Sequence, residues 1–147
     1  MEIGLAIIGN IDQSKSDLII TLSDELKEGF KNKNYGTSIK SYTIGVVCVA
    51  PQFERFFKEK KPKYTIGRKI INPDGIPFTL EDSLEYSVKI DFDDFTKADK
   101  AAALEILIKE ILFSLKVLDE LKVKFNDFNT IKFKQDLELF FKERKFA

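Results

Sequence analysis

The sequence contains no histidine and no tryptophan, and it has a single cysteine among its 147 residues. Without an imidazole, the chain cannot supply a Ser-His-Asp triad, a Cys-His dyad or histidine-assisted phosphoryl transfer. One cysteine cannot form an intramolecular disulfide or a zinc site built from several thiolates. Because Cys48 lies in an apolar run between Val47 and Val49, we interpret it as a buried structural residue and not as a nucleophile.

An excess of charge of either sign is also missing, because 24 lysines and arginines balance 24 aspartates and glutamates. Only three of the cations are arginines. A basic field that would favour nucleic acid or an anionic membrane is therefore not expected. No uncharged stretch approaches the roughly 20 residues that span a bilayer, and Ile3–Ile8 is too short for a signal-peptide core. Together with the unpaired cysteine, this predicts a cytoplasmic protein that binds neither nucleic acid nor membrane.

The apolar content of 44% is enough for a folded core, and we assign residues 1–147 to a single domain. Hydrophobic periodicity and turn residues predict strands at Ile3–Ile8, Ile39–Ala50, Tyr64–Ile71 and Phe78–Phe92, helices at Asp12–Lys31, Thr96–Lys122 and Thr130–Lys145, and a helical turn at Gln52–Lys61. Asp12 is the expected N-cap of the first helix, and Thr96-Lys97-Ala98-Asp99 resembles a capping box at the start of the second. The turn sequence Asn72–Gly75 is expected to join the third and fourth strands as a pair. The order β-α-β-β-β-α-α predicts an α+β fold, with a mostly antiparallel sheet of about four strands and helices packed on one face.

Carboxylates concentrate along the last predicted strand and at its junction with the long helix. This acidic group consists of Glu81, Asp82, Glu85, Asp91, Asp93 and Asp94. Its members Asp91, Asp93 and Asp94 could hold a magnesium ion, because hard cations prefer carboxylate oxygens. A simpler interpretation is that carboxylates at a helix start cap free N–H groups and favour the positive end of the helix dipole. A third is that the acidic edge faces a basic partner and steers its association.

Other motifs give weaker indications of chemistry. Pro73-Asp74 resembles the start of a restriction-endonuclease site, but Ser87 stands where that site needs an acid two residues before Lys89. A turn explains Asp74. The basic run Lys58–Lys63 is typical of a solvated loop, and Gly4 with Gly9 lacks the third glycine of a dinucleotide-binding loop.

Several short motifs resemble those of small immunity proteins from bacterial polymorphic-toxin systems. They are Tyr35-Gly36, Lys63-Tyr64, Val88–Phe95, Lys97-Ala98-Asp99, Ile111–Leu115, Phe128 and Phe133–Leu137. The likeness covers most of the chain and is clearest from Tyr64 onward. The first helix and the turn Asn72–Pro77 fit the family less well.

The resemblance implies a protein that is not an enzyme, that needs no cofactor or metal, and that binds and neutralises a cognate toxin. If that toxin is a nuclease with a basic cleft, the acidic group Glu81, Asp82, Glu85, Asp91, Asp93 and Asp94 is the expected contact surface. The alternative is a metal-dependent hydrolase or nuclease that uses the Asp91, Asp93 and Asp94 carboxylates. A homo-oligomer is a third possibility, which could coexist with the immunity function.

Overall fold

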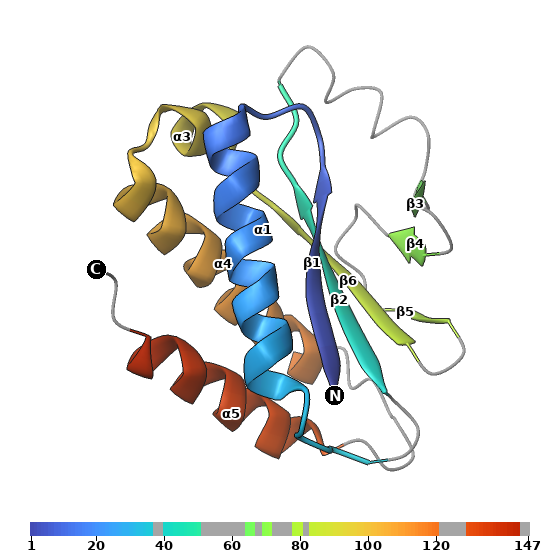
Figure 1. Ribbon diagram of the computed structural model, residues 1–147. Helices are drawn as coiled ribbons and strands as arrows, with labels where there is room; N and C mark the ends of the chain where they lie inside the picture. Colours follow the sequence, from blue (N-terminus) through green and yellow to red (C-terminus); the bar gives the residue numbers. More distant parts are fainter. Residues whose placement is uncertain are drawn as a thin grey trace.

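The computed structural model describes residues 1–36, 40–50, 64–66, 69–71, 78–80, 83–120 and 129–144. In chain order its elements are β1 (Glu2–Ile8), α1 (Gln13–Phe30), β2 (Ser41–Val47), β3 (Tyr64–Ile66), β4 (Lys69–Ile71), β5 (Phe78–Leu80), β6 (Ser83–Lys89), α3 (Phe92–Lys97), α4 (Lys100–Glu120) and α5 (Thr130–Glu143). The fold is α+β, with α1, α4 and α5 gathered on one face of the main sheet (Figure 1).

The three long strands of the main sheet are parallel, so the prediction of a mostly antiparallel sheet is wrong. The strand order is β1-β2-β6-β5, and β2 pairs in parallel with both β1 and β6. Only the three-residue strand β5 pairs with β6 in the antiparallel direction. A strand, a helix and a second strand in succession form a crossover that returns the chain in the same direction. The predicted order β-α-β at the start of the chain therefore already favoured parallel pairing of the first two strands.

The strand pairing expected between Tyr64–Ile71 and Phe78–Phe92 is also wrong. Tyr64–Ile66 pairs instead with Lys69–Ile71, as a separate two-stranded sheet of β3 and β4. The second segment likewise contains both members of a pair, β5 and β6. Each segment thus folds back on itself, because short local hairpins close with less loss of chain entropy than distant pairings. The turn Asn72–Gly75, the helical turn Gln52–Lys61 and the basic run Lys58–Lys63 lie outside the described residues.

The long helix predicted at Thr96–Lys122 is divided into α3 and α4. Ala98, at the end of α3, has an extended backbone (φ −70°, ψ 149°), and Asp99 begins the next helix. The Asp99 carboxylate accepts a hydrogen bond from the Ala102 N–H at 2.8 Å, which makes Asp99 the cap of α4. Thr96, which the sequence suggested as the cap, lies inside α3 and donates to the Phe92 carbonyl at 2.7 Å.

The elements at the two ends of the chain agree closely with the sequence prediction. Asp12 caps α1, because its carboxylate accepts from the Lys15 N–H, and α1 ends at Phe30. β1 and α5 differ from the predicted bounds by two residues at most. These elements have clear apolar periodicity and clear boundary residues, which are the most reliable local determinants of structure.

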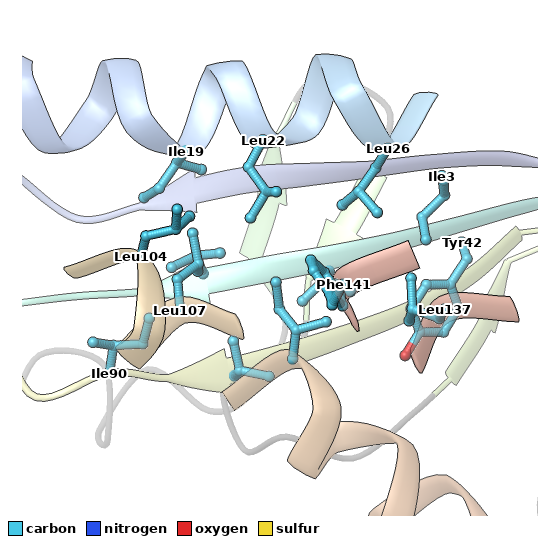
Figure 2. Close-up of a cluster of buried hydrophobic side chains, with 14 of the residues drawn as sticks. Ile3, Ile19, Leu22, Leu26, Tyr42, Ile90, Leu104, Leu107, Leu137 and Phe141 are labelled. Atoms are coloured by element: carbon cyan, nitrogen blue, oxygen red, sulfur yellow. The ribbon is translucent and has the colours of Figure 1, made fainter. Parts of the chain in front are cut away.

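One hydrophobic core lies between the helices and the covered face of the sheet. β2 is central, and six of its seven residues are buried. Leu22 and Leu26 of α1, Leu107 of α4 and Leu137 of α5 belong to one core cluster with Ile3 and Tyr42 of the sheet (Figure 2). α1 also covers the outer edge of the sheet, since Ser23 Oγ accepts from the Leu5 N–H at 3.0 Å. Edge strands that are covered in this way are protected from pairing with other chains.

An aromatic cluster fastens α5 to the rest of the molecule. The Phe133 ring lies 5.2 Å from Tyr35, 5.1 Å from Tyr42 and 6.1 Å from Phe30, measured between ring centroids. The buried Tyr35 donates its hydroxyl proton to Asp136 at 2.6 Å. The Tyr35 carbonyl also accepts from the Asn129 N–H at 2.7 Å, just before α5 begins. The segment after α1 therefore holds α5 by ring packing and by polar contacts.

We predict that Tyr35→Phe lowers the free energy of unfolding by about 1–2 kcal/mol at neutral pH, because it removes the hydrogen bond to the half-buried Asp136 carboxylate. Urea denaturation of both proteins measures the difference. Equal midpoints and slopes would show that this bond contributes nothing to stability.

The Tyr35–Asp136 hydrogen bond should also make the difference in stability between the wild type and Tyr35→Phe depend on pH. Burial raises the pKa of Tyr35 well above its ordinary value of 10, and the hydrogen bond to Asp136 raises it further. The unfolded chain therefore loses the phenolic proton first as the pH rises above 10, which favours unfolding of the wild type. The Tyr35→Phe variant has no such proton, so the gap in stability at pH 7 should shrink above pH 10.

Candidate functional site

The carboxyl ends of the three parallel strands lie at one end of the molecule (Figure 1). Gly9 follows β1 with a φ of +138°, and a Cβ there would lie 1.9 Å from the Cys48 carbonyl oxygen. Only glycine fits this close approach. The Cys48 N–H donates to the Ile8 carbonyl at 2.9 Å, and the Ile90 N–H donates to the Val47 carbonyl at 2.8 Å. The pairing thus continues to the points where the helices begin.

Aspartates cap the helices that start at this end. Asp12 precedes α1, and its carboxylate accepts from the backbone of Lys15 and from the Ser14 hydroxyl. Asp91 precedes α3 and accepts from the Asp94 N–H at 2.9 Å. Carboxylates are favourable here because a helix start has free N–H groups and a partial positive charge. The hydrogen bond from Ser14 is the main reason why the pKa of Asp12 is lowered.

Lys15, in the first turn of α1, reaches the carboxyl end of α3 from below the surface. Its side chain is buried, and its Nζ donates to the Thr96 carbonyl in the last turn of α3 at 3.4 Å. A cation is favourable at a helix carboxyl end, where unpaired carbonyls carry partial negative charge. The fully buried Phe95 ring provides the apolar half of the same attachment. Figure 1 shows α3 beside the start of α1, and the Lys15 hydrogen bond joins the two helices there.

We call this region the acidic end and define it by six exposed aspartates: Asp12, Asp17, Asp91, Asp93, Asp94 and Asp99. Four lysines accompany them, namely the buried Lys15 and the exposed Lys89, Lys97 and Lys100. Among the described residues of this end, negative charge therefore predominates, although the chain as a whole is neutral. Such a surface attracts a basic partner at long range.

The predicted contact residues fall into two groups along β6. Asp91, Asp93 and Asp94 are exposed at the carboxyl end of the sheet. Glu85 pairs with Thr43 and Phe78 nearer the start of β6, about 20 Å before Asp91 at the rise of an extended strand. Glu81 and Asp82 lie outside the described residues. The structure thus brings the three aspartates together and places Glu85 some distance along the strand.

A metal site at the aspartates would need several ligands that converge. Within the described part of the chain, no group of three or more histidine, cysteine, aspartate or glutamate residues could hold a metal ion. Asp91 instead uses its carboxylate to cap α3. The interpretation of this carboxylate as a helix cap is therefore confirmed.

Cys48 lies beneath the acidic end and is fully buried, as the sequence predicted. Burial raises the pKa of its thiol to about 11, and the negative charges of Asp91 and Asp12 contribute to the shift. At neutral pH the group is a thiol, which is a poor nucleophile and a poor metal ligand. The cysteine therefore acts as a small apolar residue at the end of the central strand.

Sequence reasoning missed half of the acidic end. Asp12 was identified only as a helix cap, and Asp17 and Asp99 were not considered as surface residues. The information was present, because the β-α-β order places the start of the first helix at the carboxyl end of parallel strands. The antiparallel prediction hid it, since antiparallel strands would have directed these helix starts to different ends.

The motifs that resemble immunity proteins have mainly structural roles. Tyr35 bonds to Asp136 and packs against the Phe133 ring, so two motifs distant in sequence meet in one cluster. Ile111 and Leu115 are buried in the core. The segment Val88–Phe95 contributes to the core and to the surface. Val88, Ile90 and Phe95 are buried, whereas its three aspartates are exposed.

Comparison with known proteins gives one match. A family model described as Immunity protein 44 matches residues 1–143, which is nearly the whole chain. No curated protein and no solved structure gives a significant match. Among the described residues, no helix has the length and apolar character needed to cross a membrane.

We predict that Asp91→Ala lowers the free energy of unfolding by about 1 kcal/mol, because the cap of α3 is lost. Asp91→Asn should cost much less, since asparagine can accept the same hydrogen bond. Thermal denaturation of the two variants compares the loss of charge with the loss of the cap. Equal destabilisation would contradict the assignment of Asp91 as a cap.

A second prediction concerns the thiol. Iodoacetamide at pH 8 should modify native Cys48 far more slowly than the same residue in urea, because the native thiol is buried and its pKa is raised. Mass spectrometry of timed samples gives both rates. Rapid modification of the folded protein would show that this end of the core opens readily.

Proposed function

This chain belongs to the Immunity protein 44 family, and on that premise we propose that it binds and neutralises a cognate toxin domain and catalyses no reaction of its own. The match over residues 1–143 is the observation that carries the proposal. The residue composition is consistent with it, because histidine is absent and the single cysteine is buried. The single buried thiol suits a reducing cytoplasm, where we propose that the protein acts.

We further propose the acidic end as the surface that meets the toxin, with Asp91, Asp93 and Asp94 as its centre. These carboxylates are exposed and closely spaced, and negative charge predominates around them. Enzymes that act on nucleic acid often have basic clefts, and opposite charge on an inhibitor accelerates its encounter with such a cleft. Glu81, Asp82 and Glu85 remain candidates for the outer part of the same contact.

The construction of this end supports a role in tight binding. α3 is fixed by the Asp91 cap, by the buried Phe95 and by Lys15. Asp93 and Asp94 therefore stand on a segment that is held on both sides. A surface that is already ordered loses little conformational entropy on binding, which leaves more of the interaction energy for affinity.

The surface can be tested with the toxin domain encoded by the neighbouring gene. We predict that Asp93→Lys combined with Asp94→Lys slows association roughly tenfold or more at low salt, because steering by charge is reversed. Neither carboxylate side chain is the cap of α3, so the Asp91 cap is kept in this variant. Surface plasmon resonance at two salt concentrations measures the rate, and survival of cells that co-express the toxin measures protection.

The matched control is Asp24→Lys combined with Glu28→Lys, which makes the same change in charge. Both residues are exposed in the second half of α1, away from the acidic end. This control should bind and protect as the wild type does. If the two double variants behave alike, the acidic end is not the contact. If the wild-type protein neither binds nor protects against that toxin, the proposed function itself fails for this pair.

A further inference from the structure

One residue on the buried side of α1 does not fit the pattern of that helix. The buried residues recur every three or four positions, as expected for a helix packed on a core. They are Lys15, Leu18, Ile19, Leu22, Ser23, Leu26 and Phe30. Lys15 is only 8% exposed and takes the first place in this stripe, where the pattern favours an apolar residue. Deviations of this kind are expected mainly at residues that serve a function.

The position of Lys15 is unfavourable for a positive charge in two ways. An ammonium group loses hydration on burial, and among the described residues it makes one hydrogen bond, to the Thr96 carbonyl at 3.4 Å. That distance is long for an N–H···O bond, and two N–H donors of the group remain. Lys15 also lies in the first turn of α1, where the partial positive charge of the helix start repels a cation. The negative charge of Asp12 offsets part of this repulsion.

The ammonium group contacts the carboxyl end of α3, a helix that needs such support. α3 has six residues, too few to be stable alone, and the extended backbone of Ala98 separates it from α4. Of these six residues, Phe95 is the buried one. The Asp91 cap lies at the amino end of α3, and the bond from Lys15 lies at the other. Lys15 therefore holds the end of α3 that is away from the cap.

We propose, resting on the function proposed above, that Lys15 is a positioning residue for toxin binding, which orders α3 and with it the Asp93 and Asp94 carboxylates at the expense of overall stability. A segment that is ordered before binding loses less entropy in the complex, so the complex dissociates more slowly. The charge of Lys15 acts in the opposite direction on association, because a cation weakens the negative field of the acidic end. Removal of the ammonium group should therefore accelerate both association and dissociation.

Hydrogen exchange of the free protein tests the ordering of α3 without any toxin. The Phe95 N–H donates to the Asp91 carbonyl at 3.1 Å and reports on α3, whereas the Ala103 N–H donates to the Asp99 carbonyl at 2.8 Å and reports on α4. Lys15→Met should exchange roughly tenfold faster at Phe95 and unchanged at Ala103. Its urea midpoint should equal or exceed that of the wild type, because an apolar side chain replaces a buried charge. Unchanged exchange at Phe95, or a lower midpoint with faster exchange at both amides, would overturn the proposal.

Binding kinetics with the toxin domain encoded by the neighbouring gene test the link to recognition. Lys15→Met should raise the association rate about twofold at low salt and the dissociation rate about tenfold. The matched control is Lys100→Met, which removes the same charge from an exposed position of the acidic end. It should accelerate association similarly and leave both dissociation and the exchange at Phe95 unchanged.

Equal dissociation rates for Lys15→Met and Lys100→Met would overturn the role of Lys15 in toxin binding. If the wild type does not bind that toxin at all, the proposed function fails for this pair. The exchange at Phe95 still decides, independently of the toxin, whether Lys15 orders α3.

Discussion

Parallel pairing of β1, β2 and β6 is the constraint on which the rest of the structure depends. Because the three strands run in one direction, their carboxyl ends meet, and the helices that follow β1 and β6 begin at the same place. Helix starts attract carboxylates. The concentration of aspartates at this end is therefore a consequence of strand direction, and the surface proposed for toxin binding comes from the topology as much as from the composition.

The core and the proposed binding surface are close neighbours in this arrangement. Phe95 is fully buried, whereas Asp93 and Asp94 on the same short helix are exposed. Lys15 provides a similar link from α1, since its buried ammonium reaches the end of α3. The proposed binding of a toxin would use this surface as it stands, with the exposed carboxylates held by the core beneath them.

How far the sequence predicts this fold depends on the range of the interactions. Local features were predictable: Asp12 as a cap, the helix that ends at Phe30, and α5 all follow from periodicity and boundary residues. Strand direction was predicted wrongly, although the order β-α-β at the start of the chain favours the parallel pairing that β1 and β2 have. The break at Asp99 was also missed, since an apolar pattern continues through it and only the cap geometry reveals it. For the proposed surface, Asp91, Asp93 and Asp94 could be found from charge clustering, but Asp12, Asp17 and Asp99 join them only in space.

Some aspartates of the acidic end cap helices and others do not, and this difference affects how the surface can change during evolution. Asp91 and Asp99 bond to the backbone, so their replacement disturbs a helix start. The carboxylate that caps α3 belongs to Asp91, whereas Asp93 and Asp94 are exposed in its first turn. Substitutions at Asp93 and Asp94 can therefore change the surface that would bind a toxin while the helix cap is kept. If the protein neutralises a toxin as proposed, we expect related sequences to differ often at Asp93 and Asp94 and to keep the caps Asp91 and Asp99.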